Sequence, residues 1–130
     1  MTPANYVADI IRTAMEDAGY KVYANHMPDS PDKSICVYDQ ATGRVEGRSM
    51  VTGEILTHPT VQIVVRGTTH AAGDTLPDVW EILREIYQYE FSDGKILHCI
   101  SKTNIMGSLG QEPQTRRTKY TQQFRMTFAE

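Results

Sequence analysis

Three side chains near the middle of the sequence could together bind an anion. Arg66 follows a run of apolar residues, and His58 and His70 stand at the two ends of the surrounding segment, HPTVQIVVRGTTH. A guanidinium beside an imidazole can hold a phosphate or a carboxylate. One interpretation is therefore a small enzyme or ligand-binding domain that uses Arg66 with His58 or His70, in a concave pocket beside Gly67.

The rest of the chain supplies few partners for such chemistry. The histidines His26, His58, His70 and His98 are scattered, and no HExxH motif or Cys/His pair at ligand spacing includes them. His98 and Cys99 are neighbours on an expected strand, so their side chains point to opposite faces. The sequence has no GxSxG, no GxGxxG and no Walker-type phosphate loop. We therefore predict no catalytic residue, no metal site and no cofactor.

Four aspartates could act as acids or bases, but local structure explains each of them. Asp29 and Asp32 flank prolines in a turn-rich segment, where carboxylates support turns. Asp74 and Asp78 stand at an expected helix start, where negative charge is favourable. We interpret all four as structural.

Composition limits the class of protein. The chain has 130 residues, is 40% hydrophobic and carries a net charge of -3, which suits one domain spanning residues 1–130 without a global basic footprint for nucleic acid. No run approaches the roughly 18 apolar residues of a membrane span, and the N-terminus lacks the features of a signal peptide. We expect a protein made in a cytoplasm, with no membrane partner. Cys36 and Cys99 lie in apolar runs and are expected to be buried, reduced thiols.

Two amphipathic helices are predicted to cover the core. The first begins at Thr2 and Pro3, a capping hydroxyl followed by proline in the first turn, and ends near Gly19. The second begins with a capping box at residues 75–78 and continues through apolar positions at helical spacing in residues 79–87.

Alternating apolar and polar residues predict the strands. In the last strand Phe124 and Met126 share one face, and Gln123 and Arg125 share the other. Strands are expected at residues 20–25, 35–39, 58–67, 95–105 and 119–128.

This order of elements predicts an α+β fold. We expect a single-layer, mostly antiparallel sheet of about five strands with two helices packed on one face. The opposite face would be open to solvent or to another subunit. It would carry Gln62, Arg66, Gln123, Arg125 and Thr127.

Two segments between strands show no clean periodicity, and both contain arginine. They are an extended arm at residues 39–57 and a flexible loop at residues 106–118. The arm contains Arg44, Arg48 and Met50, and the loop contains Arg116 and Arg117. Each segment is either a solvated excursion or an element that orders against a partner, since long loops in compact domains are usually functional or disordered.

The order of motifs resembles a known family. A helix ending in Gly-Tyr leads to MPDSPDKSICVYD, then a variable arm, then HPTVQIVVRG, a helix and two closing strands. This pattern is similar to the tail terminator proteins of long-tailed bacteriophages, also described as minor capsid or tail completion proteins. The resemblance covers roughly residues 5–128 and is most specific in MPDSPDKSICVYD and PTVQIVVRG, neither of which is a catalytic signature.

The resemblance implies a structural role without enzymatic activity. Tail terminators form a hexameric ring that caps the head-proximal end of the tail tube, ends its polymerisation and joins the tail to the head connector. The implied partners are other copies of the chain, the tail tube protein and the connector (neck) protein, with genomic DNA passing through the ring without sequence-specific binding. The implied location is the head–tail junction of the virion, after synthesis in the host bacterial cytoplasm.

On this interpretation the arginine-rich segments and the open sheet face make the subunit contacts. Arginine suits bidentate contacts to carboxylates, and ring contacts are head-to-tail. Arg66→Ala is then expected to leave the fold intact and to weaken assembly. Alternatives are a head-completion or neck protein of the same particle, the small ligand-binding or enzymatic domain described above, and an adaptor module. The candidate contact residues are Arg44, Arg48, Met50, Gln62, Arg66, Arg116, Arg117 and Arg125.

Overall fold

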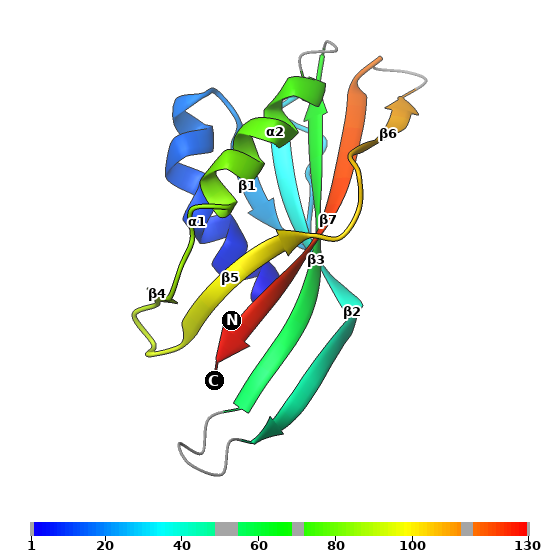
Figure 1. Ribbon diagram of the computed structural model, residues 1–130. Helices are drawn as coiled ribbons and strands as arrows, with labels where there is room; N and C mark the ends of the chain where they lie inside the picture. The colour runs from blue at the N-terminus through cyan, green and yellow to red at the C-terminus, as the bar shows by residue number, and fades with distance from the viewer. Residues whose placement is uncertain (1, 49–54, 69–71, 113–115, 130) are drawn as a thin grey trace.

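The computed structural model describes residues 2–48, 55–68, 72–112 and 116–129, and shows two helices on one face of a twisted, curled sheet (Figure 1). In these residues neither helix is long and apolar enough to cross a membrane. The elements are α1 (Pro3–Asp17), β1 (Lys21–Ala24), β2 (Ser34–Arg48), β3 (Ile55–Gly67), α2 (Ala72–Leu83), β4 (Tyr89–Glu90), β5 (Ile96–Lys102), β6 (Gly107–Gln111) and β7 (Thr118–Ala129).

The sheet confirms the predicted α+β class but differs in its details. Its strand order is β1-β2-β3-β7-β5-β4, and β6 also pairs with β7. The pair β1–β2 is parallel and the other pairs are antiparallel, so the sheet is mixed and has seven strands instead of five. The two extra strands were missed because β4 has only two residues and β6 is fully exposed, which leaves no alternation to detect.

The core lies between the helices and the central strands, as the alternating pattern predicted. Val61, Ile63 and Val65 of β3 are fully buried, and Phe124 of β7 packs beneath Trp80 of α2 with ring centroids 5.9 Å apart. The helices form the opposite side of this core. Their buried apolar side chains are Ala4, Tyr6, Val7, Ala8, Ile11 and Met15 of α1, and Leu76, Val79 and Leu83 of α2.

The first helix begins and ends where the sequence predicts. Its first residue is Pro3, and its C-terminus is closed by Gly19, whose φ of +92° lies in the left-handed region that glycine tolerates. The Gly19 N–H donates to the Glu16 carbonyl, and the Tyr20 N–H donates to the Met15 carbonyl. These two hydrogen bonds form a Schellman motif, which satisfies carbonyls that the helix end would leave without partners.

The predicted start of the second helix is wrong by three residues. The helix begins at Ala72, and the Thr75 hydroxyl donates to the Tyr20 hydroxyl at 3.0 Å instead of capping. Pro77 therefore lies inside the helix, where its missing N–H removes one bond to the carbonyl four residues before it. The helix ends at Leu83, so Tyr87 lies beyond it and is 77% exposed.

A buried tyrosine links α1 to the turn before β5 and makes stability depend on pH. The Tyr6 hydroxyl donates to the Asp93 carboxylate, and this bond is the main reason that the pKa of Asp93 lies below its usual range. A lowered carboxyl pKa contributes stability above the ordinary pKa, and that stability is lost as the pH falls through the lowered value.

We expect Tyr6→Phe to lower the midpoint of urea unfolding at neutral pH, with the difference from wild type shrinking below about pH 4. Tyr87→Phe is the matched control, since it removes an exposed hydroxyl. If Tyr6→Phe lowers the unfolding midpoint equally at neutral pH and below about pH 4, the bond to the Asp93 carboxylate is not the cause of the lost stability.

Candidate functional site

The connection between β1 and β2 crosses the sheet face opposite the helices. Because β1 and β2 are parallel, residues 25–33, here called the crossover loop, must return from the end of one strand to the start of the next. Arg66 points to this face because Val65 points into the core. The open face predicted from the sequence is therefore covered at one end, which is why Cys36 and Val64 are buried there.

The Arg66 side chain holds the crossover loop by hydrogen bonds to the carbonyl groups of the loop. Its guanidinium donates to the carbonyls of Pro28 at 2.6 Å, Pro31 at 2.7 Å and Asp32 at 3.3 Å, and to the Ser34 hydroxyl at 3.3 Å. The residue is only 2% exposed. The expectation that Arg66 lies on an exposed contact face is therefore wrong, and its donors are directed at carbonyls instead of at an anion site.

Arg117 holds the same loop through charge. Its guanidinium lies 2.7 Å from the Asp29 carboxylate, 2.7 Å from the Glu112 carboxylate and 3.4 Å from that of Asp32, and it also donates to the Asp29 carbonyl. The hydrogen bonds that Arg117 donates to Asp29 and Glu112 raise the pKa of Arg117 above its usual range, which keeps it charged. Arg117 is 3% exposed, so it is neither the solvated charge nor the docking contact that the sequence suggested.

These two arginines explain why the most specific motifs occur together. MPDSPDK supplies a proline-rich loop, and VVRG supplies the guanidinium that donates to its Pro28 and Pro31 carbonyls. The second arginine comes from the segment before β7 and adds ion pairs. Both sequences therefore contribute to the covered part of this face.

The predicted arm is a β-hairpin and not a loop. β2 continues to Arg48 and β3 begins at Ile55, and this hairpin extends past the helices at the lower end of the molecule (Figure 1). Register shifts between Gln40 and Arg44, and between Val45 and Arg48, break the alternation of side chains. Because of this break, the sequence pattern did not predict a strand here. In the register Arg44 pairs with His58, and Met50 lies outside the described residues.

The loop at residues 106–118 also contains strand structure. β6 pairs with β7, and the Gln111 side-chain amide donates to the Arg116 carbonyl at 2.9 Å. Arg116 is exposed with a φ of +57°, while the next residue is the buried Arg117. The structure therefore separates this predicted pair of contact arginines into one exposed and one buried residue.

The remaining open sheet face is polar and mostly uncharged. Arg125 is exposed there, and the half-buried Gln62 donates to the Thr121 hydroxyl at 2.8 Å. Gln123 and Thr127 are half-buried on the same face. The open sheet face that the sequence predicted is therefore present beyond the crossover loop, and Arg125 is exposed on it.

Among the residues that the structure describes, neither thiols nor metal ligands gather into a reactive site. Burial raises the pKa of the Cys36 thiol, whereas Cys99 is exposed, contrary to the prediction that both are buried. Within the described residues no group of three His, Cys, Asp or Glu side chains could hold a metal ion.

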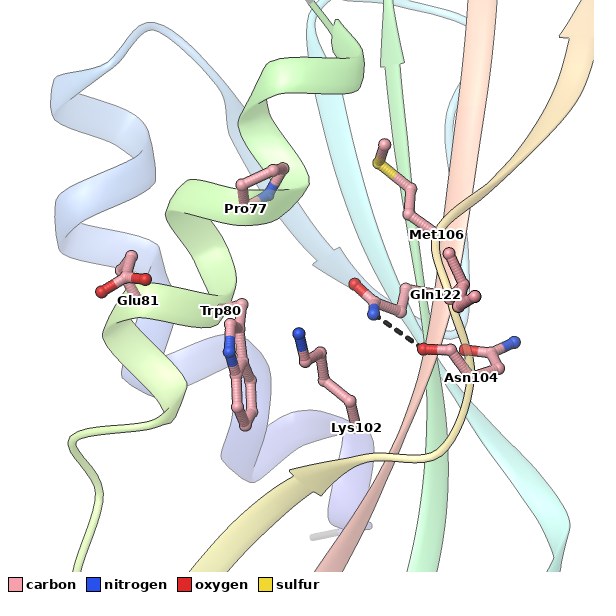
Figure 2. A pocket seen from close by; sticks show the side chains of 8 residues that line it. Pro77, Trp80, Glu81, Lys102, Asn104, Met106 and Gln122 are labelled. Carbon is pink, nitrogen blue, oxygen red and sulfur yellow. Dashed lines mark hydrogen bonds between the residues drawn. The ribbon is translucent and has the colours of Figure 1, made fainter.

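A groove that the sequence did not reveal lies between α2 and the segment joining β5 to β6 (Figure 2). It has a volume of about 380 Å³, and Trp80, Pro77 and Met106 give it apolar walls. The Lys102 ammonium lies 5.1 Å from the centre of the Trp80 ring. The Gln122 amide donates to the Asn104 carbonyl at 2.9 Å, which fixes the segment at the groove's edge. Figure 2 draws this bond as a dashed line.

Exposed apolar side chains stand beside this groove. Ile105 is 90% exposed and Leu109 of β6 is 56% exposed. Apolar residues in a segment otherwise made of glycine and polar residues, IMGSLGQ, were the available sequence signal. Such exposed apolar side chains mark candidate contact surfaces.

Comparison with known proteins gives the family. A family model described as "Bacteriophage tail terminator protein" matches residues 5–122, which include the crossover loop, Arg66 and Arg117. No curated protein matches the chain. The matched family consists of structural phage tail proteins, which are components of the virion. The chain therefore belongs to the bacteriophage tail terminator family.

Proposed function

We propose that the protein forms a hexameric ring that caps the head-proximal end of the phage tail tube, stops tube polymerisation and joins the tail to the head connector. The family match over residues 5–122 carries this proposal. The partners are other copies of the chain, the tube protein and the connector protein, and genomic DNA passes through the ring. The protein then acts at the head–tail junction and catalyses no reaction.

The shape of the subunit supports such an assembly. A ring needs two different contact patches on each subunit, because its contacts run head-to-tail. The hairpin arm and the groove beside β6 are two different surfaces, because the arm is formed by β2 and β3 and the groove lies between α2 and the segment joining β5 to β6. Arg44 and Arg48 of the arm, with the exposed Arg116 and Arg125, are the proposed polar contacts. Arg66 and Arg117 would act indirectly, by keeping the crossover loop rigid.

Loss of the protein should produce tails of uncontrolled length that lack heads. Without a cap, tube subunits continue to add to the free end, and no surface is available for the connector. We expect electron micrographs of particles made without this chain to show overlong, headless tails, and supplying the chain in trans should restore the normal length. Tails of normal length that fail only to attach to heads would instead support a neck protein, and normal particles would refute both roles.

A further inference from the structure

The outer edge of β2 lacks a neighbour over most of its length. β1 pairs with β2 only from Ser34 to Val37. At Asn25 a φ of +59° turns the chain away, and the Asn25 side chain accepts the Asp39 N–H at 2.9 Å. In the described part of the chain, no strand pairs with this edge from residue 40 to residue 48, so its backbone donors and acceptors are available to another strand.

A second free edge lies on β6. Among the described strands it pairs with β7 alone, on its inner side, and all five of its residues are exposed. Its Leu109 is exposed, and the exposed Ile105 and the groove lined by Trp80 lie beside it. We call β6, Ile105 and this groove the β6 surface. It combines a free backbone edge with apolar side chains and a pocket, which is how sheets bind an added strand.

The free edge of β2 and the free edge of β6 lie on different strands, and this difference indicates what binds to each of them. If only one kind of edge paired with its like, assembly would stop at a dimer and the other edge of each copy would stay free. If the β2 edge pairs with the β6 edge of another copy, every assembly keeps one free edge of each kind until it closes. Register shifts at Gln40/Arg44 and at Ser108/Gly110 also interrupt both edges, which disfavours indiscriminate pairing with other strands.

We propose that the outer edge of the β2 arm in one subunit adds as a strand to the β6 surface of the next copy, covering Ile105 and Leu109. The inference rests on the proposed ring, because only a closed ring satisfies both edges of every subunit. The ring wall is then a continuous sheet in which each subunit donates an arm on one side and accepts one on the other.

Disulfide cross-linking tests this pairing directly. Ser108→Cys is combined in turn with a cysteine at each of residues 41–47, in a Cys99→Ser background that removes the exposed native thiol. Paired residues on antiparallel strands have Cα atoms about 4.5–5.5 Å apart, which suits a disulfide. We expect at least one double variant to give a covalent ladder up to the ring size on oxidation, in the free protein or on purified tails. Ser101→Cys, an exposed position on β5, replaces Ser108→Cys in the control and should give no ladder.

Each alternative gives a distinct result. A covalent dimer from Ser108→Cys alone would mean that like edges pair, and a cross-link from the arm to the tube protein would assign the edge to the tube; either overturns the proposal. Rings seen by mass photometry or microscopy with no ladder anywhere in the panel would also overturn it, while leaving the capping role intact. The capping role itself fails only if tails made without the protein keep their normal length.

Discussion

Replacing Arg66 with alanine should lower the free energy of unfolding by roughly 3 kcal/mol. The substitution removes three charge-assisted hydrogen bonds to the crossover loop carbonyls and leaves a cavity under that loop. Hydrogen bonds to a charged donor each contribute about 1.5–3 kcal/mol, although a shared donor gives less than the sum. Urea unfolding of the purified subunit, followed by circular dichroism, measures the loss.

Two further variants make this result specific. Arg125→Ala removes an exposed arginine from the same sheet face and should change the free energy of unfolding by no more than about 0.5 kcal/mol. Arg66→Lys keeps the charge but not the planar set of donors, so its stability should fall between wild type and Arg66→Ala. A stable Arg66→Ala subunit that assembles poorly would contradict the structure and restore the contact role that the sequence suggested.

Replacing Arg117 with alanine should lower the free energy of unfolding by roughly 2 kcal/mol. The change leaves the carboxylates of Asp29 and Glu112 without the cation between them and removes the ion pairs that join the crossover loop to the segment before β7. The expected cost is below that of Arg66→Ala because the Asp29 side chain is largely exposed, and water can replace part of the lost contact. The same urea unfolding experiment measures the difference.

The adjacent arginine provides the control for this second variant. Arg116→Ala removes an exposed side chain one residue away, so its free energy of unfolding should stay within about 0.5 kcal/mol of wild type. Equal losses in the two variants would show that the segment before β7 matters as a whole, and that the ion pairs of Arg117 are not the cause.

The strands and helices that form the core could be predicted because burial imposes a period on the sequence. Val61, Ile63 and Val65 alternate with polar residues, and the structure buries all three. The same reasoning succeeded for β7 and for α1, whose end at Gly19 also has a local signal. It failed for the arm, because a bulge adds residues to one strand and shifts the alternation that the pattern depends on.

The sequence by itself therefore determined the α+β class, the core faces of the main strands and the family resemblance. Only the tertiary structure decided what covers the other face. Alternation shows that Arg66 points away from Val65, but an arginine facing water and an arginine buried against carbonyls give the same pattern. That distinction depends on where the crossover loop returns, and the return follows from the parallel pairing of β1 with β2. The free edges of β2 and β6 likewise follow from which strands are neighbours, a property of long-range contacts that no local pattern encodes.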